Sequence, residues 1–143
     1  MQNSQVIIQL LNGLSYALLL FLLAAGLSLI YGLMGIINMA HGSYYMLGAY
    51  IGISIARSTG SFILAIAGAA IAVSIIGLLF ERIFVRRLYK QEMNQVLLTL
   101  GFSYIFMDLT KWLWGKLPLS SPKPSLLAGS IIIQGAEFPV YRL

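Results

Sequence analysis

Two polar side chains, Asn38 and His41, stand in a stretch of sequence that otherwise holds mostly apolar residues, tyrosines and glycines. His41 is the only histidine of the chain, Gly35 precedes the pair, and Gly42 follows it directly. Backbone N–H and C=O groups have no water to bind inside a bilayer, so this pattern predicts a helix that breaks near residues 35–42 and is covered by protein. In transporters, backbone groups freed by such a break line a polar passage or a substrate site.

The chemistry expected of this break is recognition of a polar solute without a fixed charge. We predict that the substrate pathway includes Gly35, Asn38, His41 and Gly42. Asn38 is expected to cap the helix that follows, and Gly42 to mark a close approach where added bulk is not tolerated. A second interpretation stays open on residue types alone: Asn38 and His41 hydrogen-bond a neighbouring helix or lie in a short loop at the membrane surface.

Residues that could form a catalytic or metal site do not occur as a set. The four acids are Glu81, Glu92, Asp108 and Glu137, and three of them fall in predicted loops. The chain has no cysteine, which excludes a thiolate nucleophile and a cysteine metal site, and it has no Walker-type glycine loop. The sequence therefore predicts no enzyme, no metal site and no cofactor, so the energy for uphill transport has to come from another subunit or an ion.

The composition is that of an integral membrane protein. Of the 143 residues, 59% are hydrophobic and only 9% are charged, against about 25% charged residues in a soluble domain. The formal net charge of +5 fits the positive bias of membrane-flanking loops better than a nucleic-acid partner. We therefore exclude nucleic acid as a partner.

Apolar runs predict an all-α polytopic protein of about four transmembrane helices, at residues 6–33, 38–56, 61–80 and 95–115. Residues 1–56 contain no Asp, Glu, Lys or Arg. One crossing needs about 20 apolar residues, so this run supplies two crossings, or one crossing and a re-entrant hairpin. In the last span, Asp108 and Lys111 lie three residues apart and can pair.

The connections between these spans predict the topology. The loop at residues 81–94 carries Arg82, Arg86, Arg87 and Lys90. By the positive-inside rule it is cytoplasmic, and three crossings before it place the N-terminus outside, whereas a re-entrant hairpin would place it inside. Residues 116–143 then lie outside, and the β-branched run with its glycine and proline punctuation predicts a short external β-hairpin near residues 126–141.

Two further patterns concern contacts with neighbours. Gly48 and Gly52 are four residues apart, and Gly32 follows Ser28 at the same spacing, which is typical of faces where membrane helices pack closely. The basic residues Arg82, Arg86 and Lys90 are expected on one helical stripe, where they act as topology determinants. The alternative is that the stripe contacts an ATPase subunit or anionic membrane lipid.

A run of motifs carries a resemblance to a known family. Residues 12–50 contain "GLSLIYG", "NMAHG" and "MLGAY" in that order, and "LLTLGFSYIFMDLTKWLWG" follows. This sequence closely resembles the start of the branched-chain amino-acid permease family of ABC importers, and "GSIIIQG" resembles the family's external insertion. The resemblance covers nearly all of the chain but only the first half of a typical member, so the chain is expected to be truncated.

The resemblance implies a multi-pass permease subunit of the inner (plasma) membrane that translocates branched-chain amino acids in an ATP-driven importer. The implied partners are a second homologous permease subunit, two ABC ATPase subunits and an extracytoplasmic substrate-binding protein. The urea or short-amide branch of the family stays open. So do a non-transporting membrane assembly subunit and a channel or ion-driven carrier, for which His41, Asp108 and Lys111 are the intramembrane ionisable candidates.

Overall fold

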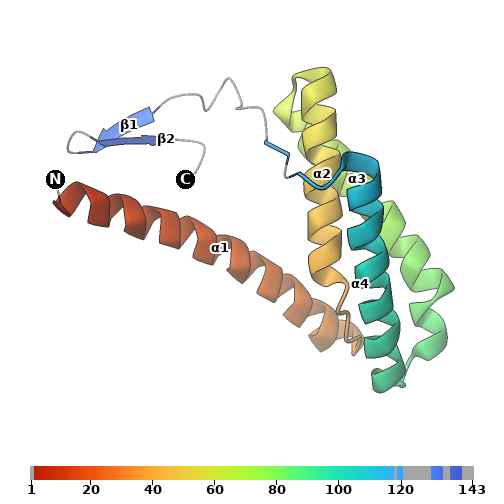
Figure 1. Ribbon diagram of the computed structural model, residues 1–143. Helices are drawn as coiled ribbons and strands as arrows, with labels where there is room; N and C mark the ends of the chain where they lie inside the picture. The colour runs from red at the N-terminus through yellow and green to blue at the C-terminus, as the bar shows by residue number, and fades with distance from the viewer. Residues whose placement is uncertain (1, 118, 121–129, 134–135, 140–143) are drawn as a thin grey trace. The chain divides into compact units, whose positions relative to one another are not determined.

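The computed structural model describes residues 2–117, 119–120, 130–133 and 136–139. Its helices are α1 (Gln2–Met34), α2 (His41–Thr59), α3 (Phe62–Ile83), the short 3-10 helix η1 (Val85–Leu88) and α4 (Glu92–Trp114) (Figure 1). Two strands follow, β1 (Ser130–Ile133) and β2 (Ala136–Pro139). The chain divides into two compact units, one of residues 25–122 and the other of residues 1–24 and 123–143.

Three of the described helices, α1, α3 and α4, are long and apolar enough to cross a membrane. The prediction of a polytopic helical membrane protein is therefore confirmed for these three spans. The remaining expected span, residues 38–56, corresponds to α2, which is not among the helices that meet this criterion. Its glycines, serines and tyrosines lower its apolar content, and Ser43, Tyr44 and Leu47 are buried within the protein.

Within the unit of residues 25–122, α2 lies alongside both α3 and α4 (Figure 1). Aromatic rings fill the space between the three helices: the centroids of Phe80 and Phe102 are 4.5 Å apart, and those of Tyr44 and Phe106 are 5.2 Å apart. Both separations lie in the favourable range for ring pairs. A short turn through Gly60, which has a left-handed φ of 67°, reverses the chain between α2 and α3.

The far ends of α2 and α4 are also joined. The Trp114 indole N–H donates a hydrogen bond to the Ser54 hydroxyl at 2.6 Å, and the Trp114 and Tyr50 rings are 5.6 Å apart. Arg57 donates to the carbonyl of Ser120 at 2.8 Å. The ends of α2 and α4 therefore meet opposite the basic loop.

The strands belong to the other unit. β1 and β2 pair antiparallel, with Ser130 opposite Pro139 and Ile133 opposite Ala136. They fall within residues 126–141, where the sequence predicts a hairpin, but residues 134–135 between the strands lie outside the described residues.

Candidate functional site

A break of six residues, 35–40, separates α1 from α2, at the position predicted from the sequence. Gly35 ends α1 with φ +62°, and its N–H donates to the carbonyl of Tyr31 at 2.9 Å. Glycine adopts this left-handed conformation without the strain that a Cβ would add. Gly42 lies in the first turn of α2 rather than in the break.

Side chains of α4 hold the break. The Gln95 carbonyl oxygen Oε1 accepts the Ile37 N–H at 3.2 Å, and the Thr99 hydroxyl accepts the Met39 N–H at 3.0 Å. Gln95 is 1% exposed and Thr99 is 0% exposed. Buried backbone groups that a break frees need such partners, because water is excluded.

The side chains of Gln95 and Thr99 are each held in place by a second hydrogen bond. The Gln95 amide nitrogen donates to the carbonyl of Leu88 at 2.9 Å, and the Thr99 hydroxyl donates to the carbonyl of Gln95 at 2.8 Å. The Thr99 hydroxyl thus acts as a hydrogen-bond donor within its own helix and as an acceptor for the break. The break is level with the first two turns of α4, at the end of the bundle that carries the basic loop.

Asn38 satisfies one backbone group of the break but does not cap α2. Its side-chain oxygen accepts the Ala40 N–H at 3.0 Å, and its carbonyl accepts the His41 N–H at 3.2 Å. The N-cap of α2 is Ala40, with no side-chain cap, so the prediction of an Asn38 cap is wrong. Asparagine bonds readily to the backbone two residues on, and here that turn is completed before the helix begins.

His41 fills a space that α1 leaves open at Gly26. A Cβ added to Gly26 would lie 2.8 Å from the His41 ring nitrogen Nε2. A Cβ added to Gly42, by contrast, would meet nothing within 4 Å among the described residues. The described residues thus place a close approach at Gly26, and the close approach at Gly42 stays a prediction.

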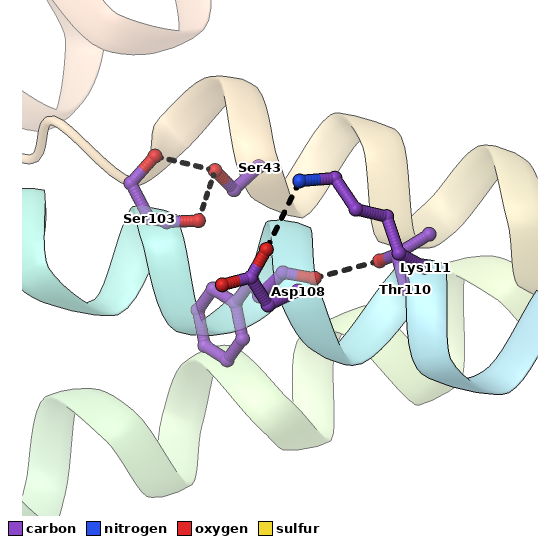
Figure 2. A network of polar contacts seen from close by, with 6 residues as sticks. Ser43, Ser103, Asp108, Thr110 and Lys111 are labelled. Carbon is purple, nitrogen blue, oxygen red and sulfur yellow. Dashed lines mark hydrogen bonds and ion pairs between the residues drawn. The ribbon is translucent and has the colours of Figure 1, made fainter. Parts of the chain in front are cut away.

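Polar side chains form a stripe along the face of α4 that contacts the break and α2. The hydroxyls of Ser43 and Ser103 are 2.7 Å apart, and Figure 2 shows this pair linking α2 to α4. Gln95, Thr99 and Ser103 recur every four residues and so share one face of α4. We did not predict these three residues, although their spacing within an apolar span is the signal that could have identified them.

Asp108 and Lys111 form the expected pair, with Nζ and Oδ1 3.0 Å apart (Figure 2). Their side chains are 77% and 53% exposed in the described structure. The pair therefore lies on the face of α4 away from the aromatic core.

A pocket of about 280 Å³ opens beside the break. It is lined by the end of α1, the break, α2, α3 and η1, and its polar wall residues are Asn38, His41, Tyr44 and Glu81. Asn38 and His41 are thus brought together, whereas Gly35 and Gly42 are not among the lining residues.

Comparison with known proteins decides the family. Residues 9–133 match the family model described as branched-chain amino acid transport system / permease component. The chain belongs to this permease family.

Named relatives of this permease chain agree. A stretch of 43 residues is 49% identical to the high-affinity branched-chain amino acid transport system permease protein BraD of Pseudomonas aeruginosa, covering 30% of this chain and 14% of that relative. Over 139 residues, the corresponding permease protein LivH is 29% identical in Salmonella typhimurium and 27% identical in Escherichia coli, covering 90% of this chain and 44% of each relative. The chain thus spans less than half the length of these curated relatives. No solved structure matches it.

The small residues of this permease chain differ in their surroundings. A Cβ added to Gly52 would lie 3.5 Å from the Ala69 Cβ, and one added to Gly48 would lie 3.3 Å from a Val73 methyl group. Gly48 and Gly52 therefore lie where α2 and α3 approach closely. A Cβ added to Gly32 would meet nothing within 4 Å in the described part of the chain.

The basic loop of the permease chain is not one helical stripe. Arg82 lies in the last turn of α3, Arg86 and Arg87 lie in η1, and Lys90 follows with φ +69°. The predicted stripe is wrong because α3 ends at Ile83, and Val85, 3% exposed, turns into the core. All four basic side chains are exposed.

A hydrogen bond also spans this loop. The Tyr89 hydroxyl donates to Glu81 at 2.6 Å, and this bond raises the pKa of Tyr89 above its ordinary value. The bond connects the end of the loop to the last turn of α3.

Proposed function

We propose that this chain supplies membrane spans of a permease subunit in an ATP-driven importer of the cell inner membrane, and that the importer carries branched-chain, hydrophobic amino acids. The observation that carries the proposal is the family match over residues 9–133. The names of the relatives support the substrate class. Two ABC ATPase subunits, a second homologous permease subunit and an extracytoplasmic binding protein complete the proposed assembly.

The break supports a role in the pathway. A zwitterionic amino acid needs polar partners for its ammonium and carboxylate groups. Asn38 and His41 line the pocket beside a break whose backbone is already held by α4. Polar groups beside a helix break are a recurrent feature of substrate pathways in transporters.

The test is uptake of labelled solutes by cells that carry or lack the gene for the complete permease. We expect its deletion to abolish high-affinity uptake of leucine, isoleucine and valine, and the same loss when the Walker lysine of the partner ATPase is replaced. Loss of urea or short-amide uptake with normal leucine uptake would favour the other branch of the family. Unchanged uptake of both leucine and urea or short amides would favour an assembly subunit. Leucine uptake that continues without the ATPase would favour a channel or an ion-driven carrier.

The proposed topology places residues 81–94 in the cytoplasm and residues 116–143 outside. α2 runs alongside two helices that can each cross the bilayer, which supports a third crossing before the basic loop and an N-terminus outside. We expect a cytoplasm-active reporter to be active when fused after Lys90, and an externally active reporter after Ser120. External activity at Lys90 would contradict the topology, and an N-terminal reporter active inside would support a re-entrant α2.

A further inference from the structure

The pocket beside the break has an apolar wall with unused polar groups at its edge. Ile30, Val73 and Phe80 contribute apolar surface from α1 and α3. Its volume of about 280 Å³ is close to the lower end, about 300 Å³, of pockets that bind small molecules. A compact, mainly apolar ligand matches this space.

Three polar groups at this pocket are not used by the fold. Among the described residues, no hydrogen bond is made by the His41 imidazole, the Asn38 amide nitrogen or the Tyr44 hydroxyl. The Tyr44 side chain is 9% exposed, and its hydroxyl oxygen is buried. A buried hydroxyl without a partner is rare in folded proteins, but this oxygen has less than 1 Å² of accessible surface, so the groups left for a ligand are those of His41 and Asn38.

One carboxylate completes the set. Glu81 lines the same pocket, and its Oε1 accepts the Tyr89 hydroxyl while Oε2 makes no hydrogen bond in the described part of the chain. The carboxylate of Glu81 can accept N–H bonds from an ammonium group, whereas the amide nitrogen of Asn38 can donate to a carboxylate. The pocket thus offers partners for both ends of a zwitterion, next to apolar surface.

We propose that this pocket is a binding site for a hydrophobic α-amino acid at the cytoplasmic end of the permease, occupied before release into the cell. The site rests on the proposed function and adds to it a place where the substrate stays. The ammonium pairs with Glu81, the carboxylate accepts from the Asn38 amide nitrogen, and the side chain packs against Val73 and Phe80.

Gly77 gives direct access for a test. It lines the pocket, and a Cβ added to it would meet none of the residues that the structure describes within 4 Å. The chain contains no cysteine, so Gly77→Cys introduces a single thiol into it, and this thiol lies at the pocket. Ser74→Cys is the matched control, because Ser74 is exposed on the same helix and is not a lining residue.

The experiment measures maleimide labelling of these two variants in the complete, reconstituted transporter. With leucine at about ten times its dissociation constant, we expect labelling at Gly77→Cys to slow about tenfold by simple occupancy, and labelling at Ser74→Cys to be unchanged. Glycine, which lacks the apolar side chain, should give no protection. Adding Glu81→Gln should weaken protection by leucine.

Filling the pocket gives a second, independent readout. We expect Gly77→Leu to lower leucine uptake about tenfold at normal membrane levels, and Ser74→Leu to leave it near normal. Wild-type leucine import together with unprotected labelling at Gly77→Cys and normal uptake by Gly77→Leu would overturn the site while leaving the proposed function intact. Failure of the wild-type transporter to import any branched-chain amino acid would instead overturn the proposed function.

Discussion

Thr99→Val in the complete permease will lower its free energy of unfolding by about 1–3 kcal/mol, because the Met39 N–H in the break then has no partner. Valine keeps the shape of threonine but removes the hydroxyl that accepts this N–H at 3.0 Å. Thr99 is 0% exposed, so water cannot replace it. The measurement is the midpoint of thermal unfolding in detergent, together with leucine uptake after reconstitution.

Thr110→Val is the matched control. Thr110 lies in the same helix, is 2% exposed, and donates to the carbonyl of Phe106 at 2.7 Å, as Thr99 donates to Gln95. The difference is that Thr110 accepts no backbone N–H from another segment among the described residues. We expect Thr110→Val to cost less than half as much as Thr99→Val. Equal costs would show that the hydrogen bond from the Met39 N–H to Thr99 contributes nothing beyond the intrahelical bond.

Gly26→Ala will displace the His41 imidazole and lower leucine uptake. The new Cβ would lie 2.8 Å from Nε2 and 3.1 Å from Cε1 of His41, so the ring has to move. These atoms are the far end of a half-buried side chain, so the ring can turn away at less than the roughly 1–3 kcal/mol of overpacking in a filled core, and the better helix propensity of alanine offsets up to about 1 kcal/mol. We therefore expect an unfolding midpoint close to that of the wild type and slower uptake, measured in the same preparations.

Two variants make this result specific. Gly32→Ala adds a Cβ to the same helix at a position where no described residue lies within 4 Å, so it should leave stability unchanged or raise it. His41→Ala combined with Gly26→Ala removes the clash, and the double variant should be more stable than the sum of the two single effects predicts. Additive effects would show that Gly26 and His41 do not contact each other in the working transporter.

The position of the break could be predicted from the sequence, because its causes are local. Gly35 permits the left-handed end of α1, and the long charge-free run before it fixes the apolar helix. The spans now seen as α1, α3 and α4 follow from length and hydropathy for the same reason. These features depend on neighbours along the chain and need no knowledge of the packing.

The partners of the break could not be predicted, because they come from about 60 residues away. The four-residue spacing of Gln95, Thr99 and Ser103 indicates a polar face on α4, but not which segment it meets. The roles of Gly42 and Gly26 could not be told apart from the sequence for a similar reason: glycine is needed either for its backbone or for the space beside it, and only the packing distinguishes the two. Gly26 stands in an unbroken helix and carried no local signal of its role.

The hydrogen bonds of α2 suggest how the bundle moves. α2 and its preceding break are bonded to α4 along the whole length, through Thr99, Ser103 and Trp114. Between α2 and α3, by contrast, the described residues make apolar contacts at Gly48 and Gly52 and a ring contact between Tyr44 and Phe80, and no hydrogen bond. Apolar surfaces of small residues can slide by small amounts, whereas hydrogen-bonded helices keep their register. A switch between outward and inward access would then carry α2 and α4 as one rigid body, with shear along α3.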